Sequence, residues 1–205
     1  MEEALAVERA VIFIDTGAVS VRAKTAEGGA EGGRKGGEGC SKNSGEALVV
    51  GLVVDALRTC GVGNEAIGVI SPYRAQVKEI SGSLDACGHS DVEVSTVDKY
   101  QGRDMECVIL SLVRCNASGE VGELLADWRR INVAITRAKS KLLLIGCATT
   151  LRSDPLLARM VAKVSALRGF VTLEAHDLIE GAPAWAAPLA KELHQKAENG
   201  RMAAH

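Results

Sequence analysis

Apolar runs alternate with amphipathic stretches along most of this chain. Short, nearly continuous apolar runs predict buried strands at 11–14, 67–70, 92–96, 107–113 and 141–146. Stretches with helical spacing lie between or after them and predict helices at 44–60, 71–87, 127–139 and 155–167. Because strands and helices alternate, we expect an α/β fold: a mainly parallel sheet with helices on both faces.

Three of these helices carry more detailed predictions. In the first, Leu48, Leu52 and Ala56 recur at helical spacing and are expected to form the buried face. The second is expected to begin with Ser71 as N-cap and Pro72 as its first residue. In the third, an apolar stripe is expected, formed by Trp128, Ile131, Ile135 and Ala138.

Composition changes along the chain and predicts its organisation. Residues 1–22 would hold the first strand, and 23–43 read as a flexible Gly-rich surface insertion. Residues 44–170 would form the main domain, and 171–205 an Ala-rich tail with one helical candidate at 188–197. Arg34-Lys35 does not make the insertion a phosphate loop, since no Gly-Lys-Ser/Thr follows.

Overall composition excludes several classes of protein. The net charge of −2 gives no basic surface for nucleic acid, and an aromatic content of 3% argues against a sandwich or a stacking platform. The six cysteines form no C-x-x-C pair, so no zinc, iron–sulfur or other metal site is expected, and Cys107 and Cys147 read as core residues. Without a signal-peptide pattern or a membrane-length apolar run, the chain is expected to be soluble and intracellular.

The run 94–104 ends a predicted strand in a cluster of hydroxyl, amide and charged groups. Thr96 is expected at the carboxyl end of its strand, where open α/β sheets bind ligands, and its hydroxyl can donate to a phosphate. Gly102 permits close backbone approach or a positive φ, and Gln101 and Arg103 flank it with donors, ahead of Asp104. The alternatives are an ordinary strand threonine and a charged turn.

The run 132–139 places a second polar cluster before the last predicted strand. Arg137 offers parallel guanidinium donors that suit phosphate oxygens, and Arg130 lies seven residues earlier on the same predicted helical face. Two solvated arginines are the alternative. Asn132 and Thr136 lie one turn apart and either share a ligand contact or serve capping and packing.

The turn at 71–76 is a third candidate. It places free backbone amides at a helix N-terminus, a natural phosphate site that includes Pro72. Tyr73 either stacks on a base or packs in the core. Arg74 and Gln76 contact either phosphate or another domain; the residues themselves do not decide which.

Together, the runs 67–76, 96–104 and 127–139, with Leu143-Leu144-Ile145-Gly146, resemble the second RecA-like domain of superfamily 1B helicases, a P-loop NTPase-type fold. Within that group the chain is most similar to the eukaryotic nuclease–helicases of Okazaki-fragment processing. That similarity rests on the sequences of 96–104, 121–130 and 134–139 and covers roughly residues 9–150 apart from the insertion.

The resemblance implies a motor that uses ATP and Mg²⁺, both held mainly by a first RecA-like domain. It assigns Arg137 as the arginine finger and implies that Asp104 contacts the nucleotide ribose, directly or through water. The residues that it places at the ATP site are Gln101, Gly102, Arg103, Asp104 and Arg130. Contacts to single-stranded DNA fall to Pro72, Tyr73, Arg74, Thr96 and Asn132. Further expectations are a nuclease domain as partner and a place in the nucleus.

What the chain lacks limits this expectation. No G-x-x-x-x-G-K-[ST] loop occurs in it, so we expect a motor fragment that is inactive alone. Two alternatives stay open: an RNA helicase of the nonsense-mediated-decay type, and a truncated, non-enzymatic module that keeps the fold. None of the motif residues distinguishes DNA from RNA.

Overall fold

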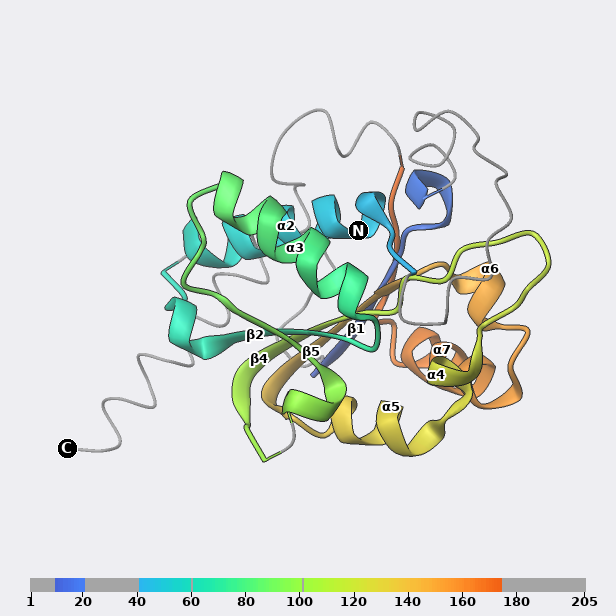
Figure 1. Ribbon diagram of the computed structural model, residues 1–205. Helices are drawn as coiled ribbons and strands as arrows, with labels where there is room; N and C mark the ends of the chain where they lie inside the picture. Colours follow the sequence, from blue (N-terminus) through green and yellow to red (C-terminus); the bar gives the residue numbers. More distant parts are fainter. Residues whose placement is uncertain (1–9, 21–40, 60, 101, 175–205) are drawn as a thin grey trace.

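The computed structural model describes residues 10–20, 41–59, 61–100 and 102–174, and within them it forms one six-stranded parallel sheet with helices on both faces (Figure 1). The strand order is β3-β2-β4-β5-β1-β6, and every neighbouring pair is parallel. The strands are β1 (Val11–Asp15), β2 (Ile67–Ser71), β3 (Glu93–Thr96), β4 (Met105–Ser111), β5 (Ala138–Gly146) and β6 (Phe170–Thr172). The α/β fold is therefore confirmed.

Alternation along the central strands divides the core into two layers. On β1, Ile12 and Ile14 belong to one buried cluster while Phe13 belongs to the other. The same split separates Leu143 from Leu144 on β5. Because both faces of each strand are covered, the strands read as continuous apolar runs.

One face of the sheet is covered by α2 (Ser44–Thr59) and α3 (Arg74–Ala86), which lie together above it in Figure 1. The predicted buried stripe of α2 is wrong at Leu48, which is 47% exposed, and confirmed at Ala56, which is buried. The helix buries a valine-rich face instead, with Val50, Val53 and Val54 fully covered. Spacing alone did not separate two overlapping apolar stripes on one helix.

The other face is covered by the short helices η4 (Val97–Tyr100), α4 (Glu123–Ala126) and α6 (Ala148–Leu151) and by the longer α5 (Trp128–Ile135) and α7 (Pro155–Ala166). Of the stripe predicted for α5, Ile131 is buried but Trp128 is 55% exposed. Cys107 and Cys147 are buried, as predicted, and burial raises the pKa of the Cys107 thiol to about 12.

Two helix boundaries differ from the prediction. Ser71 is not an N-cap, because it stays in β2 opposite Thr96 and its hydroxyl donates to the carbonyl of Ser111 at 3.1 Å. The cap of α3 is Tyr73, and no side-chain hydrogen bond supports it. The predicted helix 127–139 stops at Ile135, since β5 begins at Ala138 and takes the following residues into the sheet.

Several features were not predicted or lie outside the described part. The strand β6 has only three residues, too few to show a pattern, and η3 (Asn64–Ala66) is also short. Most of the predicted insertion 23–43 and of the predicted tail 171–205 lies outside the described residues, including the helical candidate 188–197. No helix in the described ranges is long and apolar enough to cross a membrane.

Candidate nucleotide and nucleic-acid interface

Arg137 and Asp104 meet at the edge of the sheet where β4 and β5 begin. Each comes one residue before its strand, and the Met105 amide donates to the Arg137 carbonyl at 3.0 Å. The Nη1 of Arg137 donates to the Oδ1 of Asp104 at 2.8 Å. The two side chains are 22% and 50% exposed, so the pair is open to a ligand. Pairing of the two adjacent strands thus joins two motifs that lie far apart in sequence.

The guanidinium of Arg137 is held in place by its own helix end. Its Nε donates to the Val133 carbonyl at 3.0 Å, and its Nη2 donates to the Thr136 hydroxyl at 3.2 Å. With the bond to Asp104, these contacts use three of the five guanidinium N–H groups. The remaining two have no partner among the described residues and can serve phosphate oxygens.

The loop before Asp104 has the backbone predicted for it. Gly102 has φ +84°, and nothing lies within 4 Å of an added Cβ, so backbone conformation rather than space requires glycine there. Arg103 is an exposed residue and pairs with Glu93 of β3. Gln101 lies outside the described residues.

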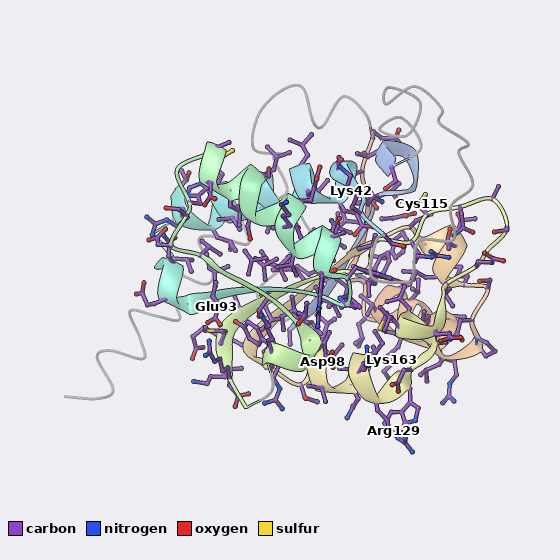
Figure 2. All side chains as sticks on the ribbon, viewed as in Figure 1. Lys42, Glu93, Asp98, Cys115, Arg129 and Lys163 are labelled. Atoms are coloured by element: carbon purple, nitrogen blue, oxygen red, sulfur yellow. The ribbon has the colours of Figure 1, made fainter. Side chains whose placement is uncertain are left out.

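Arg130 is not on the same helical face as Arg137, because α5 ends before Arg137. Its guanidinium pairs with Asp127 at 3.6 Å and with Asp98 of η4 at 3.9 Å. The prediction that a shared helix face brings the two arginines to one cleft is therefore wrong. Asp98, labelled in Figure 2, ties α5 to the short helix that follows Thr96.

Thr96 lies at the carboxyl end of β3, as predicted, and lines a pocket of about 330 Å³. Arg74 at the start of α3 and Lys99 of η4 line the same pocket, and both are exposed. Lys99 was not among the predicted site residues. Lys99 reaches this pocket because the short helix η4 brings residue i+3 back beside residue i.

Four residues of the turn 71–76 are buried: Ser71, Pro72, Tyr73 and Gln76. Tyr73 is 1% exposed and donates its hydroxyl to the Val121 carbonyl at 3.4 Å, so of the two alternatives the structure has the packed one. Pro72 is buried as well, and Gln76 is fully buried. In this arrangement only Arg74 of the predicted turn is available to a nucleic acid. Asn132 is exposed but lines a groove between α5 and α7, away from the Thr96 pocket.

A buried polar network lies behind this end of the sheet. The Oε2 of Glu46 accepts from the Ser111 hydroxyl at 2.7 Å and from the Val113 amide at 2.8 Å. Gln76 donates to the Ser111 hydroxyl at 3.1 Å and bonds the backbone of Asn43 through both ends of its amide. Burial raises the pKa of Glu46 to about 8, although the bonds from Ser111 and Val113 favour the ionised form.

The network holds a strained turn. Val113 has φ +71°, which a β-branched residue rarely adopts, and the Arg114 amide donates to the Leu112 carbonyl at 2.8 Å across it. The Val113 amide is held by Glu46, and its carbonyl accepts from Asn43 at 3.0 Å. These bonds fix a conformation that costs roughly 1–3 kcal/mol. Among the described residues, no group of three or more His, Cys, Asp or Glu side chains is arranged for a metal ion.

A family model described as an AAA domain matches residues 2–149. The chain belongs to this family. It is 47% identical over 116 residues, 57% of its length, to the DNA replication ATP-dependent helicase/nuclease DNA2 of Xenopus laevis. Identity to the human protein of that name is 43% over 140 residues, 68% of this chain, and to Arabidopsis thaliana JHS1 40% over 135 residues, 65%.

The matched segments are small parts of these relatives. They cover 10%, 13% and 10% of the three proteins, so the chain spans about a tenth of their length. Family and relatives make this AAA domain a helicase domain of superfamily 1B, similar to the helicase/nucleases named above. The parallel sheet with its two helical layers is the RecA-like fold expected for such a domain.

Proposed function

We propose that this chain is the second motor domain of an ATP-dependent DNA helicase. The observation that carries the proposal is the pairing of Arg137 with Asp104, since it joins the two motifs that suit nucleotide chemistry. A first motor domain would supply the phosphate loop that the chain's sequence lacks. The two domains would then share one ATP between them.

The described residues fit one side of a nucleotide. Arg137 supplies a fixed guanidinium with two N–H groups left over, and Asp104 supplies an acceptor for a ribose hydroxyl. Bound ATP with Mg²⁺ would provide the phosphoryl group that is transferred to water. Arg137 would exchange the carboxylate of Asp104 for phosphate oxygens and stabilise the charge that develops there. Gly102 gives the loop its conformation, and we assign Gln101 and Arg103 to the rim of the same site.

We further propose that the Thr96 pocket holds the backbone of single-stranded DNA. Thr96 offers a hydroxyl donor, and Arg74 and Lys99 bring two exposed cations to the same pocket. Phosphate contacts of this kind position a strand without reading its sequence. A chain with net charge −2 needs such a local cationic site to bind a polyanion.

The relatives support DNA rather than RNA, because their names describe DNA replication proteins that combine helicase and nuclease. By that similarity we propose a nuclease domain in the complete protein and a place in the nucleus. In the described residues the metal-binding carboxylate cluster of a nuclease is not found. Cleavage would thus belong to another part of the complete protein.

Two measurements test the proposal. The purified 205-residue chain should bind ATP very weakly and should not hydrolyse it, and robust turnover by this chain alone would contradict the shared site. The complete motor should unwind a DNA duplex with a single-stranded tail. Preferential unwinding of the matched RNA duplex would assign the domain to RNA instead.

A further inference from the structure

A groove of about 590 Å³ between α5 and α7 is lined mainly by apolar side chains. Trp128 is 55% exposed and Leu156 is 44% exposed. Both lie on the groove, so their exposure is not scattered over the surface. Clustered exposed apolar residues mark interaction sites more often than isolated ones do.

The two walls of the groove follow helical spacing. On α5, Trp128, Ile131 and Ile135 are separated by three and four residues and form one ridge. On α7, Leu156 and Met160 are separated by four residues and form the other. Two roughly helical ridges with a trough between them present the form of surface into which an amphipathic helix packs.

All charged side chains that line the groove are positively charged. Arg159 and Lys163 line it, and the other lining residues are uncharged. Arg129, next to Trp128, is exposed, and Figure 2 labels it together with Lys163 on the side of the molecule covered by α5 and α7. None of the three cations forms an ion pair within the described ranges. A partner with carboxylates beside its apolar face would complement this rim.

We propose that the α5–α7 groove binds an amphipathic helix of a partner protein, one whose apolar ridge is flanked by acidic residues. The apolar ridge would cover Trp128, Leu156 and Met160, and the acidic flank would lie against Arg159 and Lys163. The groove shares no lining residue with the Thr96 pocket and contains neither Asp104 nor Arg137. Binding there is therefore an interaction separate from the motor chemistry proposed above.

The lining favours a peptide over single-stranded nucleic acid. Nucleic acid binds such surfaces by stacking successive bases on aromatic side chains, and Trp128 is the one aromatic residue in the lining. The remaining apolar residues are Ile, Leu and Met, which have no π face and are typical of helix-binding grooves.

The test uses a labelled synthetic peptide of about four helical turns, with leucines at alternating three- and four-residue spacing and glutamates beside them. Its matched control replaces every glutamate with lysine. Binding to the 205-residue chain is followed by fluorescence anisotropy, and the contact surface is mapped from backbone amide shifts. The protein variants are Trp128→Ala and Arg159→Glu with Lys163→Glu. The matched protein control is Leu48→Ala, which removes a side chain of similar exposure from α2.

The acidic peptide should bind saturably, with amide shifts confined to α5 and α7. Each groove variant should weaken binding of the acidic peptide at least about tenfold, whereas Leu48→Ala should bind it as tightly as the parent chain. The lysine peptide should not bind and defines the background. All substituted side chains are exposed, and unchanged thermal unfolding shows that each variant is folded. A dissociation constant weaker than about 1 mM, or equal binding by groove and control variants, would overturn the proposal. Shifts of the same residues by a single-stranded oligonucleotide, without any response to the peptide, would assign the groove to nucleic acid and overturn it as well.

Discussion

The guanidinium of Arg137 donates to the carboxylate of Asp104 at 2.8 Å, across two strands that begin side by side. Arg137 is also fixed by the Val133 carbonyl and the Thr136 hydroxyl, so its position does not depend on Asp104 alone. An arginine held by its own helix end, with spare donors, is prepared for an anion before the anion arrives.

Asp104→Asn should change the stability of the chain little and the function of the motor strongly. The ion pair is half open to solvent, so its loss should lower the free energy of unfolding by less than about 1 kcal/mol. In the complete motor the same substitution should weaken nucleotide binding, measured with a fluorescent ATP analogue. A large loss of stability in urea unfolding would instead mean that the Arg137–Asp104 pair stabilises the fold.

Lys99→Ala should weaken binding of single-stranded DNA and reduce its dependence on salt. If Lys99 neutralises one phosphate, the slope of log K against log salt should fall by roughly 0.7. The control is Lys78→Ala, since Lys78 is an exposed cation on α3 that lines a different pocket. An equal decrease for both variants would mean that only overall charge matters at this surface.

Thr96→Val tests the hydroxyl in the same pocket without changing the volume of the side chain. Loss of a hydrogen bond to a charged phosphate should weaken DNA binding by roughly 1.5–3 kcal/mol, about 10- to 150-fold. Because Thr96 is 9% exposed, urea unfolding of the variant must accompany the binding measurement. Unchanged affinity in a folded variant would leave Thr96 as an ordinary strand residue.

The strands could be predicted because a parallel strand covered on both faces is a continuous apolar run, as in Leu142–Ile145. The edge strand β6 could not, since three residues show no period. Helix ends were missed where tertiary structure decides them: Ser71 bonds to β4 rather than capping α3. The burial of Tyr73 could not be predicted either, because one sequence does not show which side of a turn packs against the rest of the protein.

The site was predicted in part for a similar reason. Asp104, Gly102 and Arg137 lie in contiguous motifs, so their chemistry could be read directly from local sequence. Their contact with one another depends on the pairing of β4 with β5, which the sequence implies only through the fold. The network around Glu46 draws on three distant segments, and an isolated glutamate in an amphipathic helix gives no sign of it.

Glu46 should make the stability of the chain fall as pH rises. Its pKa of about 8 in the folded protein exceeds the ordinary value of 4.5, so between these values the folded state binds more protons than the unfolded state. The free energy of unfolding should therefore decrease by up to about 1.4 kcal/mol per pH unit from this group. Its contribution is complete below pH 4.5 and is lost by about pH 8. Urea unfolding of Glu46→Gln at several pH values should no longer show this part of the decrease in the free energy of unfolding with pH. If the variant and the parent show the same dependence on pH, the buried carboxyl is not protonated as inferred.

Gly68 and Tyr100 should behave as a coupled pair. A Cβ added at Gly68 would lie 1.8 Å from the Tyr100 hydroxyl, so Gly68→Ala should cost roughly 1–3 kcal/mol by overpacking. The hydroxyl is buried without a hydrogen-bond partner among the described residues, so Tyr100→Phe should be neutral or stabilising. The alanine should cost less in the phenylalanine background, because the nearest ring carbon is 2.8 Å away. Additive effects in a double-mutant cycle would contradict this contact.

Hydrolysis of ATP by the complete motor carrying Arg137→Ala tests whether Arg137 is the arginine finger. DNA-stimulated turnover should fall by about 10³–10⁵-fold, while affinity for single-stranded DNA should stay within about twofold of the parent. Lys139→Ala, the exposed cation two residues later, serves as the matched control and should leave turnover unchanged. Equal loss of DNA binding and turnover, or full turnover without the guanidinium, would contradict the assignment of Arg137 as the arginine finger.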